Sequence, residues 1–204
     1  MGSPLGQDNL SCFAVLLAAG RASRYGKNKI TEAKLDGVPI GLISAKLYQS
    51  CVPTIAVVKP DDEPTKHMFE EAGLTVVTAE NARLGMGNSL AAGVSAISNK
   101  GATHCLIALA DMPLVTEATL RRLIDTLCGG ENIIVRPSYN GVVGNPVGFA
   151  RRYFAELMAL DEDQGAKQIV AQHDSAVVTV EVADSGVIYD IDKPQDLTQA
   201  HQHN

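Results

Sequence analysis

The chain has 204 residues, a formal net charge of −6 at pH 7, 46% hydrophobic residues and 20% charged residues. This length and composition are typical of one globular domain with a sizeable core. The negative net charge argues against a general nucleic-acid-binding surface, and no apolar stretch reaches the length of a membrane span. The four scattered cysteines lack C-x-x-C spacing, which argues against a zinc or thioredoxin-like site.

Residues 1–10 carry neither the positive charges nor the long apolar stretch of a secretory signal. We expect them to be a disordered lead-in, and we expect residues 11–204 to form a single domain. A cytoplasmic location is the simplest expectation for such a chain.

Apolar runs alternate with amphipathic segments along the rest of the chain. Strands are predicted at residues 13–19, 54–58, 74–78, 105–110, 132–135, 176–182 and 187–191. Helices are predicted at residues 39–49, 62–72, 88–98, 116–127, 151–160, 165–172 and 195–201. The first four strands are continuous apolar runs, as in parallel sheets with helices on both faces. The pattern therefore predicts an α/β fold, a three-layer α/β/α sandwich with a mostly parallel sheet.

The alternation of strands and helices breaks between residues 136 and 149, where the sequence is rich in turn residues. Asn140-Gly141 lies between β-forming residues, which is a strong hairpin signal. We expect a small β-hairpin insertion over one edge of the sheet, where it would close over an acceptor substrate.

The segment from Gly20 to Lys29 follows the first apolar run at once and contains two glycines and four cations. Small residues let backbone N–H groups approach a ligand closely, and cations offset its negative charge. The loop is not a Walker A motif, because five residues separate Gly20 from Gly26 and Asn28 follows Lys27. Ala22 stands where a dinucleotide fingerprint requires glycine. The segment therefore predicts a phosphate-binding loop of another kind.

Asp111 follows the predicted strand 105–110 directly, so it lies at the sheet edge where the phosphate-binding loop begins. A carboxylate beside phosphates is a suitable ligand for Mg2+. The alternative is a helix N-cap, but four residues separate Asp111 from Thr116. Asp190 and Asp192 alternate on the predicted strand 187–191, so both can face one site. A cap of the last helix is the alternative role for Asp192.

The loop resembles the L-A-A-G-x-S-x-R-x-G-x-x-K signature of the MobA-like NTP transferase family. The matching residues are Leu17, Ala18, Ala19, Gly20, Arg24, Gly26 and Lys29. The resemblance implies that Leu17 to Gly20, Arg24 and Lys29 bind a nucleotide. It also implies that Lys29, Arg24 and Asp111 are catalytic, and that Asp190 or Asp192 is a second carboxylate for Mg2+.

Two further segments resemble motifs of the same family. Residues 85–90 are similar to its G-x-x-x-S-L segment, which implies that Gly85 and Ser89 border the nucleotide. Residues 144–149 are similar to its G-H-P segment, which implies that Gly144, Asn145 and Pro146 bind the acceptor. Asn145 stands where the family has histidine.

The resemblance implies a Rossmann-like nucleotidyltransferase that uses Mg2+ and transfers CMP from CTP to the phosphate of molybdopterin, releasing pyrophosphate. Ala19 follows the L-A-A-G form of the cytidylyl branch, whereas the guanylyl branch tends to L-A-G-G. The alternatives are a guanylyltransferase, a sugar- or polyol-phosphate nucleotidyltransferase, and a non-catalytic accessory protein that binds molybdenum cofactor. A molybdoenzyme client is a further expected partner, whereas nucleic acid and membrane are not.

Overall fold

The computed structural model describes residues 11–20, 25, 28–130, 133–161 and 165–200. The expected lead-in at residues 1–10 therefore lies outside the described residues. The main sheet has the strand order β10-β7-β9-β6-β1-β4-β5, and β8 pairs with β7. Its strands are β1 (Cys12–Leu17), β4 (Thr54–Val58), β5 (Thr75–Thr78), β6 (His104–Leu109), β7 (Ile134–Tyr139), β8 (Val142–Val143), β9 (Val147–Ala150) and β10 (Val177–Glu181). A separate hairpin joins β2 (Lys34–Leu35) to β3 (Val38–Pro39).

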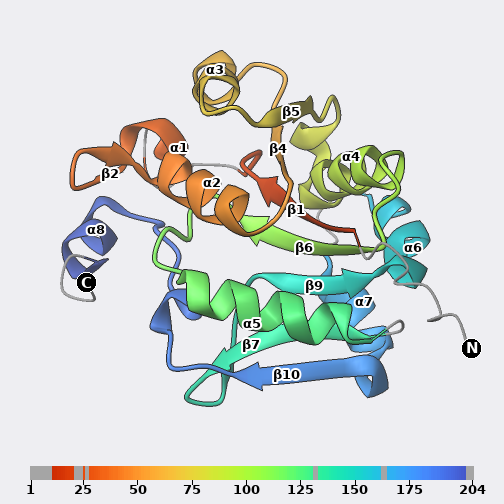
Figure 1. The fold of residues 1–204 in the computed structure, drawn as a ribbon. Coiled ribbons are helices and arrows are strands. Elements are labelled where there is room, and N and C mark those ends of the chain that lie inside the picture. Colours follow the sequence, from red (N-terminus) through yellow and green to blue (C-terminus); the bar gives the residue numbers. More distant parts are fainter. Residues whose placement is uncertain (1–10, 21–24, 26–27, 131–132, 162–164, 201–204) are drawn as a thin grey trace, which may run out of the picture.

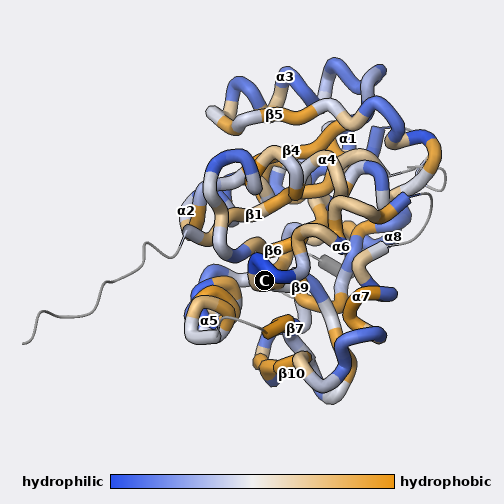
Figure 2. Tube along the Cα trace, turned by 90° about the vertical axis from the view of Figure 1, so that its right-hand side faces the viewer, coloured by the Kyte–Doolittle hydropathy of each residue, from blue (hydrophilic) through white to orange (hydrophobic). Residues whose placement is uncertain are grey.

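Helices cover both faces of the main sheet, so the predicted three-layer α/β/α fold is confirmed (Figure 1). One face is covered by α2 (Ile40–Cys51), α3 (Glu63–Glu71) and α5 (Glu117–Cys128). The other is covered by α4 (Met86–Ser98), α6 (Phe154–Met158) and α7 (Lys167–Gln172). The sheet lies between these two sets of helices when the molecule is seen along the layers (Figure 2). The remaining helices are α1 (Lys29–Glu32), α8 (Pro194–Ala200) and the 3-10 helices η1 (Ala82–Leu84), η2 (Arg151–Tyr153), η3 (Asp174–Ala176) and η4 (Ser185–Ile188).

Helix α4 packs closely on the centre of the sheet because it carries a glycine at the contact. Its Leu90, Val94 and Ile97 recur at helical spacing and are buried. A Cβ at Gly93 would lie 2.8 Å from the Val57 side chain and would also clash with Val15. This close contact fixes the start of α4 beside the carboxyl ends of β1 and β4.

The hairpin signal at Asn140-Gly141 is confirmed, because β7 and β8 pair in antiparallel fashion on either side of it. Both residues have positive φ, 50° for Asn140 and 78° for Gly141, as type I′ turns require. The expected insertion over one edge is only partly right. Residues 147–150 form β9, which lies inside the sheet and pairs antiparallel with both β6 and β7.

The predicted strand at residues 187–191 is wrong. The segment contains the last two residues of η4 and then an irregular stretch that is tied to the loop after β6 instead of pairing in a sheet. Gly186 packs against the backbone of Leu114 and Val115, with no room for a side chain. Ile191 N–H donates to the Asp111 carbonyl at 2.9 Å. The alternation argument for Asp190 and Asp192 therefore has no basis in the structure.

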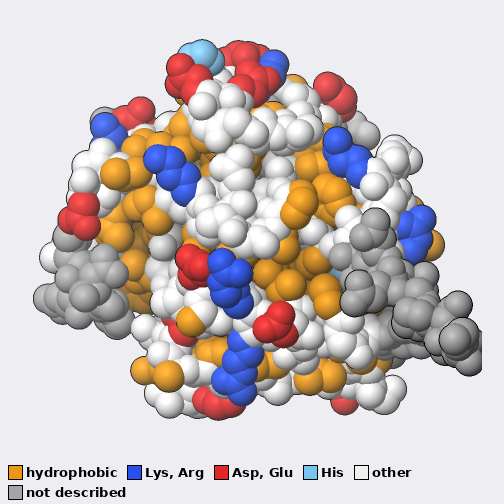
Figure 3. Space-filling view, in the orientation of Figure 1, with side chains coloured by type: hydrophobic (Ala, Val, Ile, Leu, Met, Phe, Trp, Pro, Cys, Tyr) orange, Lys and Arg blue, Asp and Glu red, His pale blue; other side chains and the backbone are white. Residues whose placement is uncertain are grey.

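Cations and anions are interspersed on the face drawn in Figure 3, and acidic side chains gather over α3. The described part of this face has no broad basic surface, which agrees with the net charge of −6. Within the described residues, none of the helices combines the length and apolarity needed to cross a bilayer.

Candidate active site

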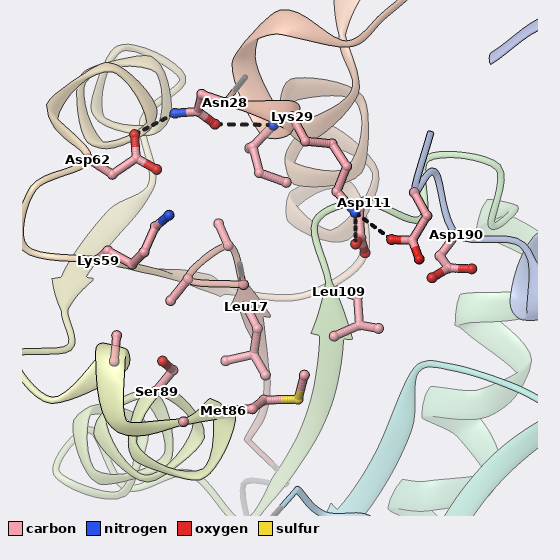
Figure 4. A pocket seen from close by; sticks show the side chains of 17 residues that line it. Leu17, Asn28, Lys29, Lys59, Asp62, Met86, Ser89, Leu109, Asp111 and Asp190 are labelled. Atoms are coloured by element: carbon pink, nitrogen blue, oxygen red, sulfur yellow. Dashed lines mark hydrogen bonds and ion pairs between the residues drawn. The ribbon is translucent and has the colours of Figure 1, made fainter. Parts of the chain in front are cut away.

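A pocket of about 360 Å³ opens at the carboxyl ends of β1, β4 and β6, where an open α/β sheet binds its ligands. Figure 4 shows side chains from both helical layers around it. The lining residues are Leu17, Ala18, Ala19, Gly20, Asn28, Lys29, Ile30, Lys59, Asp62, Ala82, Gly85, Met86, Ser89, Leu109, Asp111, Asp190 and Asp192.

The structure brings most of the predicted site residues together in this pocket. They are Leu17, Ala18, Ala19, Gly20, Lys29, Gly85, Ser89, Asp111, Asp190 and Asp192. Arg24 lies outside the described residues. Gly144, Asn145 and Pro146 do not line the pocket, although they directly precede β9. Because β9 pairs with β6 and Val147 lies opposite Ile107, these three residues are at the same sheet edge as Asp111.

Three carboxylates meet at one end of the pocket and form an acidic cluster. Asp111, Asp190 and Asp192 each place an oxygen within 4.8 Å of the others. The Lys29 ammonium lies against two of them, 2.7 Å from Asp111 Oδ2 and 3.1 Å from Asp192 Oδ1 (Figure 4). The Lys29 side chain is only 10% exposed, so these ion pairs are sheltered from water. Lys29 thus offsets part of the negative charge of the cluster.

The pKa values of Lys29 and Asp190 are shifted by burial and by the charges of their neighbours in the acidic cluster. Burial lowers the pKa of the Lys29 ammonium, but the Asp111 and Asp192 carboxylates outweigh burial and raise it above its ordinary value. Burial, together with the negative charge of Asp192, raises the pKa of Asp190. Lys29 is therefore charged at neutral pH, and Asp190 gives up its proton less readily than an isolated carboxyl group.

The backbone around the acidic cluster is held by hydrogen bonds from several elements. The buried Ser44 hydroxyl of α2 donates to the Ala110 carbonyl at 3.1 Å. Asp196 Oδ2 accepts from the backbone N–H groups of Asp192 and Lys193 at 2.8 and 2.7 Å. These bonds fix the chain on either side of the carboxylates.

The helix-cap alternative does not describe Asp111. Thr116 caps α5, since its hydroxyl accepts from Thr119 N–H, so Asp111 is not the cap of that helix. At the start of α8, Asp196 accepts the backbone N–H bonds, while the Asp192 side chain accepts from Lys29. Asp111 is therefore not used as a cap, and the Asp192 carboxylate binds Lys29 in the pocket.

Asn28 positions Lys29, and sequence reasoning missed this role. Its Oδ1 accepts from Ile30 N–H and caps the short helix α1. Its Nδ2 donates to Asp62 Oδ1 at 2.6 Å and to the Thr65 hydroxyl at 3.0 Å. Asp62 also caps α3 through Thr65 N–H, so one buried carboxylate ties α1 to α3.

The opposite end of the pocket is lined by residues from the end of β4, from η1 and from the start of α4. Gly85 precedes α4 with a φ of 152°, and no side chain caps this helix. The Ser89 side chain is buried in the first turns of α4, yet its hydroxyl has no hydrogen-bond partner among the described residues. Lys59, Met86 and Leu109 also reach the pocket and were not among the predicted residues.

The family model described as the MobA-like NTP transferase domain matches residues 14–177. Since this match covers most of the chain, the chain belongs to the MobA-like NTP transferase family and is a nucleotidyltransferase of that family.

Two curated relatives align along nearly the whole chain. Purine catabolism protein PucB of Bacillus subtilis is 30% identical over 90% of this chain and 93% of its own length. Molybdenum cofactor cytidylyltransferase of Escherichia coli is 23% identical over 92% of this chain and 94% of its own length.

Among solved structures, Rv0371c of Mycobacterium tuberculosis in complex with manganese has a TM-score of 0.78 and 25% identity. The match covers 95% of this chain and 100% of that chain. A divalent metal ion suits the acidic cluster here, because Mg2+ and Mn2+ prefer oxygen ligands and the three carboxylates converge. Asp111, Asp190 and Asp192 are the described residues that can hold it.

Proposed function

We propose that this protein transfers CMP from CTP to the terminal phosphate of molybdopterin cofactor, with Mg2+ and with release of pyrophosphate. The observation that carries the proposal is the convergence of Lys29 and three carboxylates at one end of a pocket that extends to the start of α4. The E. coli relative is named for the same transfer.

The reaction forms a bond between an acceptor phosphate oxygen and the α-phosphorus and breaks the bond to the β-phosphate. The electron pair of that bond leaves with pyrophosphate, so no covalent enzyme intermediate is needed. When bound, Mg2+ supplies charge neutralisation at the phosphate oxygens. Lys29 stabilises the negative charge that grows on the leaving group, while Asp111, Asp190 and Asp192 would hold the metal. Arg24 contacts the same phosphates in this proposal.

The proposal places the nucleotide along the pocket. Leu17, Ala18, Ala19 and Gly20 contact the nucleotide at the end of β1, where the small side chains of the last three and the backbone N–H groups let it approach closely. Gly144, Asn145 and Pro146 contact the acceptor from the strand edge beside Asp111. The acceptor therefore approaches from the β6–β9 side and the base lies on the β4 side.

The test is pyrophosphate release measured with each of the four NTPs and a panel of acceptors. We expect the fastest release with CTP and molybdopterin cofactor. Guanylyl transfer, or transfer to a sugar or polyol phosphate, would show a different best nucleotide or acceptor in the same assay. A protein that binds molybdenum cofactor but releases no pyrophosphate with any pair would be the accessory protein instead.

A further inference from the structure

Lys59 is a cation of the pocket to which neither the resemblance nor the proposed function assigns a role. It follows β4 directly, is half-buried and extends into the pocket at the end away from the acidic cluster (Figure 4). Within the described part of the chain, no hydrogen bond or ion pair involves its ammonium. Lys29, in contrast, is bound by two carboxylates in the same pocket.

A second observation shows that buried polar groups at this end of the pocket lack hydrogen-bond partners. The Ser89 side chain is 2% exposed and lines the pocket, and its hydroxyl has no partner among the described residues. The Asn88 Nδ2 beside it is also buried without one. Burying a donor without an acceptor costs free energy, so these groups indicate a ligand that supplies acceptors.

The nearby carboxylates bind residues other than Lys59. Asp62 Oδ1 accepts from Asn28 Nδ2 and from Thr65 N–H, and it does not pair with Lys59. Asp61 forms an ion pair with Arg83 of η1, which joins the loop after β4 to the segment before α4. Lys59 follows β4 and Ser89 lies in α4, and the ion pair between Asp61 and Arg83 links these two sides of the pocket. Both side chains keep hydrogen-bond donors that a ligand can use.

We propose that Lys59 reads the nucleotide base and selects bases that carry a carbonyl oxygen. This inference rests on the proposed function, in which the triphosphate lies at the acidic cluster and the nucleoside at the opposite end. An ammonium can only donate hydrogen bonds. Cytosine, uracil and guanine each present a carbonyl oxygen to such a donor. Adenine has no carbonyl oxygen: its acceptors are ring nitrogens, and where guanine has O6 it carries an amino group whose protons an ammonium cannot accept.

The experiment measures dissociation constants of CTP, UTP, GTP and ATP with Mg2+ by calorimetry for the wild type, Lys59→Met and Lys66→Met. Methionine keeps the length and apolar stem of lysine but removes the charge. Lys66 is the matched control, because it lies on α3 seven residues away, pairs with Glu63 at 3.8 Å and does not line the pocket. Thermal melting without ligand checks that each variant is folded.

We expect Lys59→Met to weaken binding of the carbonyl-bearing nucleotides by about tenfold or more, the usual size for a hydrogen bond to a charged group. Binding of ATP should change by less than about twofold, and Lys66→Met should leave all four affinities unchanged. An equal loss for all four nucleotides would mean that Lys59 contacts the phosphates, and no loss would mean no contact. Either result overturns the inference. If the wild type bound none of the four, the proposed function itself would fail.

Discussion

Lys29, at one end of the pocket, is bound by the carboxylates of Asp111 and Asp192. At the other end, Lys59 and the Ser89 hydroxyl have no hydrogen-bond partner among the described residues. At the first end the Lys29 ammonium already offsets part of the negative charge of the carboxylates. A metal ion that binds there must therefore compete with Lys29 for the same carboxylate oxygens. The second end has donors without protein acceptors, so a ligand there adds hydrogen bonds without breaking any between protein groups. Removing one polar group should therefore affect activity, ligand binding and stability differently at the two ends of the pocket.

Asp111→Asn should have the largest effect. It removes a charge from the carboxylate that lies closest to Lys29 and belongs to the acidic cluster, so metal and phosphate binding both suffer. We expect kcat to fall by about a thousandfold or more, in the range for loss of a major electrostatic group. The control is Asp125→Asn on the exposed side of α5, which should keep full activity. Wild-type turnover by Asp111→Asn at limiting Mg2+ would show that Asp111 is not a metal ligand.

Lys29→Met should lower kcat by about a hundredfold, because charge on the leaving pyrophosphate loses its nearest ammonium. The same change should strengthen binding of Mn2+ in the absence of nucleotide, since the ammonium no longer shares the carboxylates with a metal ion. Titration followed by electron paramagnetic resonance measures that affinity.

Lys46→Met, on the exposed side of α2, is the matched control and should change neither quantity. Weaker Mn2+ binding by Lys29→Met would mean that the ammonium holds the carboxylates in place. Mild and equal losses of kcat in Lys29→Met and Lys27→Met would mean that the loop acts only as a general basic surface.

The layers of the fold could be predicted because they depend on local periodicity. Continuous apolar runs gave the central strands, and helical spacing gave α2, α3, α4 and α5. The short strand β9 could not be predicted, because its four residues include Gly148 and follow Pro146. Its place in the sheet comes from pairing with β6 and β7, which are distant in sequence. The strand prediction at residues 187–191 was wrong for the converse reason, because a local pattern was overruled by a distant contact. The apolar side chains suit a strand, but Gly186 packs on the loop after β6.

For the pocket, too, local sequence patterns predicted single residues but not the contacts between residues that are distant in sequence. Asp111 and Lys29 could be proposed because each follows a buried strand or lies in a glycine-containing loop, and the structure places them 2.7 Å apart. The contact between Asn28 and Asp62 joins residues 34 positions apart and depends on how α1 packs on α3. Two signals were visible, because Asn is a frequent N-cap and Asp62 is the first residue of a predicted helix. Nothing in the sequence indicated that the two caps are bonded to each other.

Ala19→Gly tests whether the size of the nucleoside end sets the choice of base. Ala19 is buried at the end of β1 and lines the pocket, so its methyl group narrows the space for a base. We predict that the wild type prefers CTP to GTP and that Ala19→Gly relaxes this preference without reversing it. One methyl group is worth about 1–3 kcal/mol of discrimination. The measurement is kcat/KM for both nucleotides with one acceptor, and a wild-type preference for GTP would assign the protein to the guanylyl branch.

Ser89→Ala should have the smallest effect, and the comparison with Ser44→Ala makes it informative. Both hydroxyls are buried, but Ser44 donates to the Ala110 carbonyl whereas Ser89 has no partner among the described residues. Ser44→Ala should lower the free energy of unfolding by about 1–2 kcal/mol, because it leaves a buried carbonyl unpaired. Ser89→Ala should leave Tm unchanged or raise it, yet weaken nucleotide binding by about threefold to tenfold through loss of one neutral hydrogen bond. Thermal melting and calorimetry separate the two quantities. If Ser89→Ala lowered Tm as much as Ser44→Ala and left nucleotide affinity intact, its hydroxyl would serve the fold, and the contrast between the two ends of the pocket would not hold.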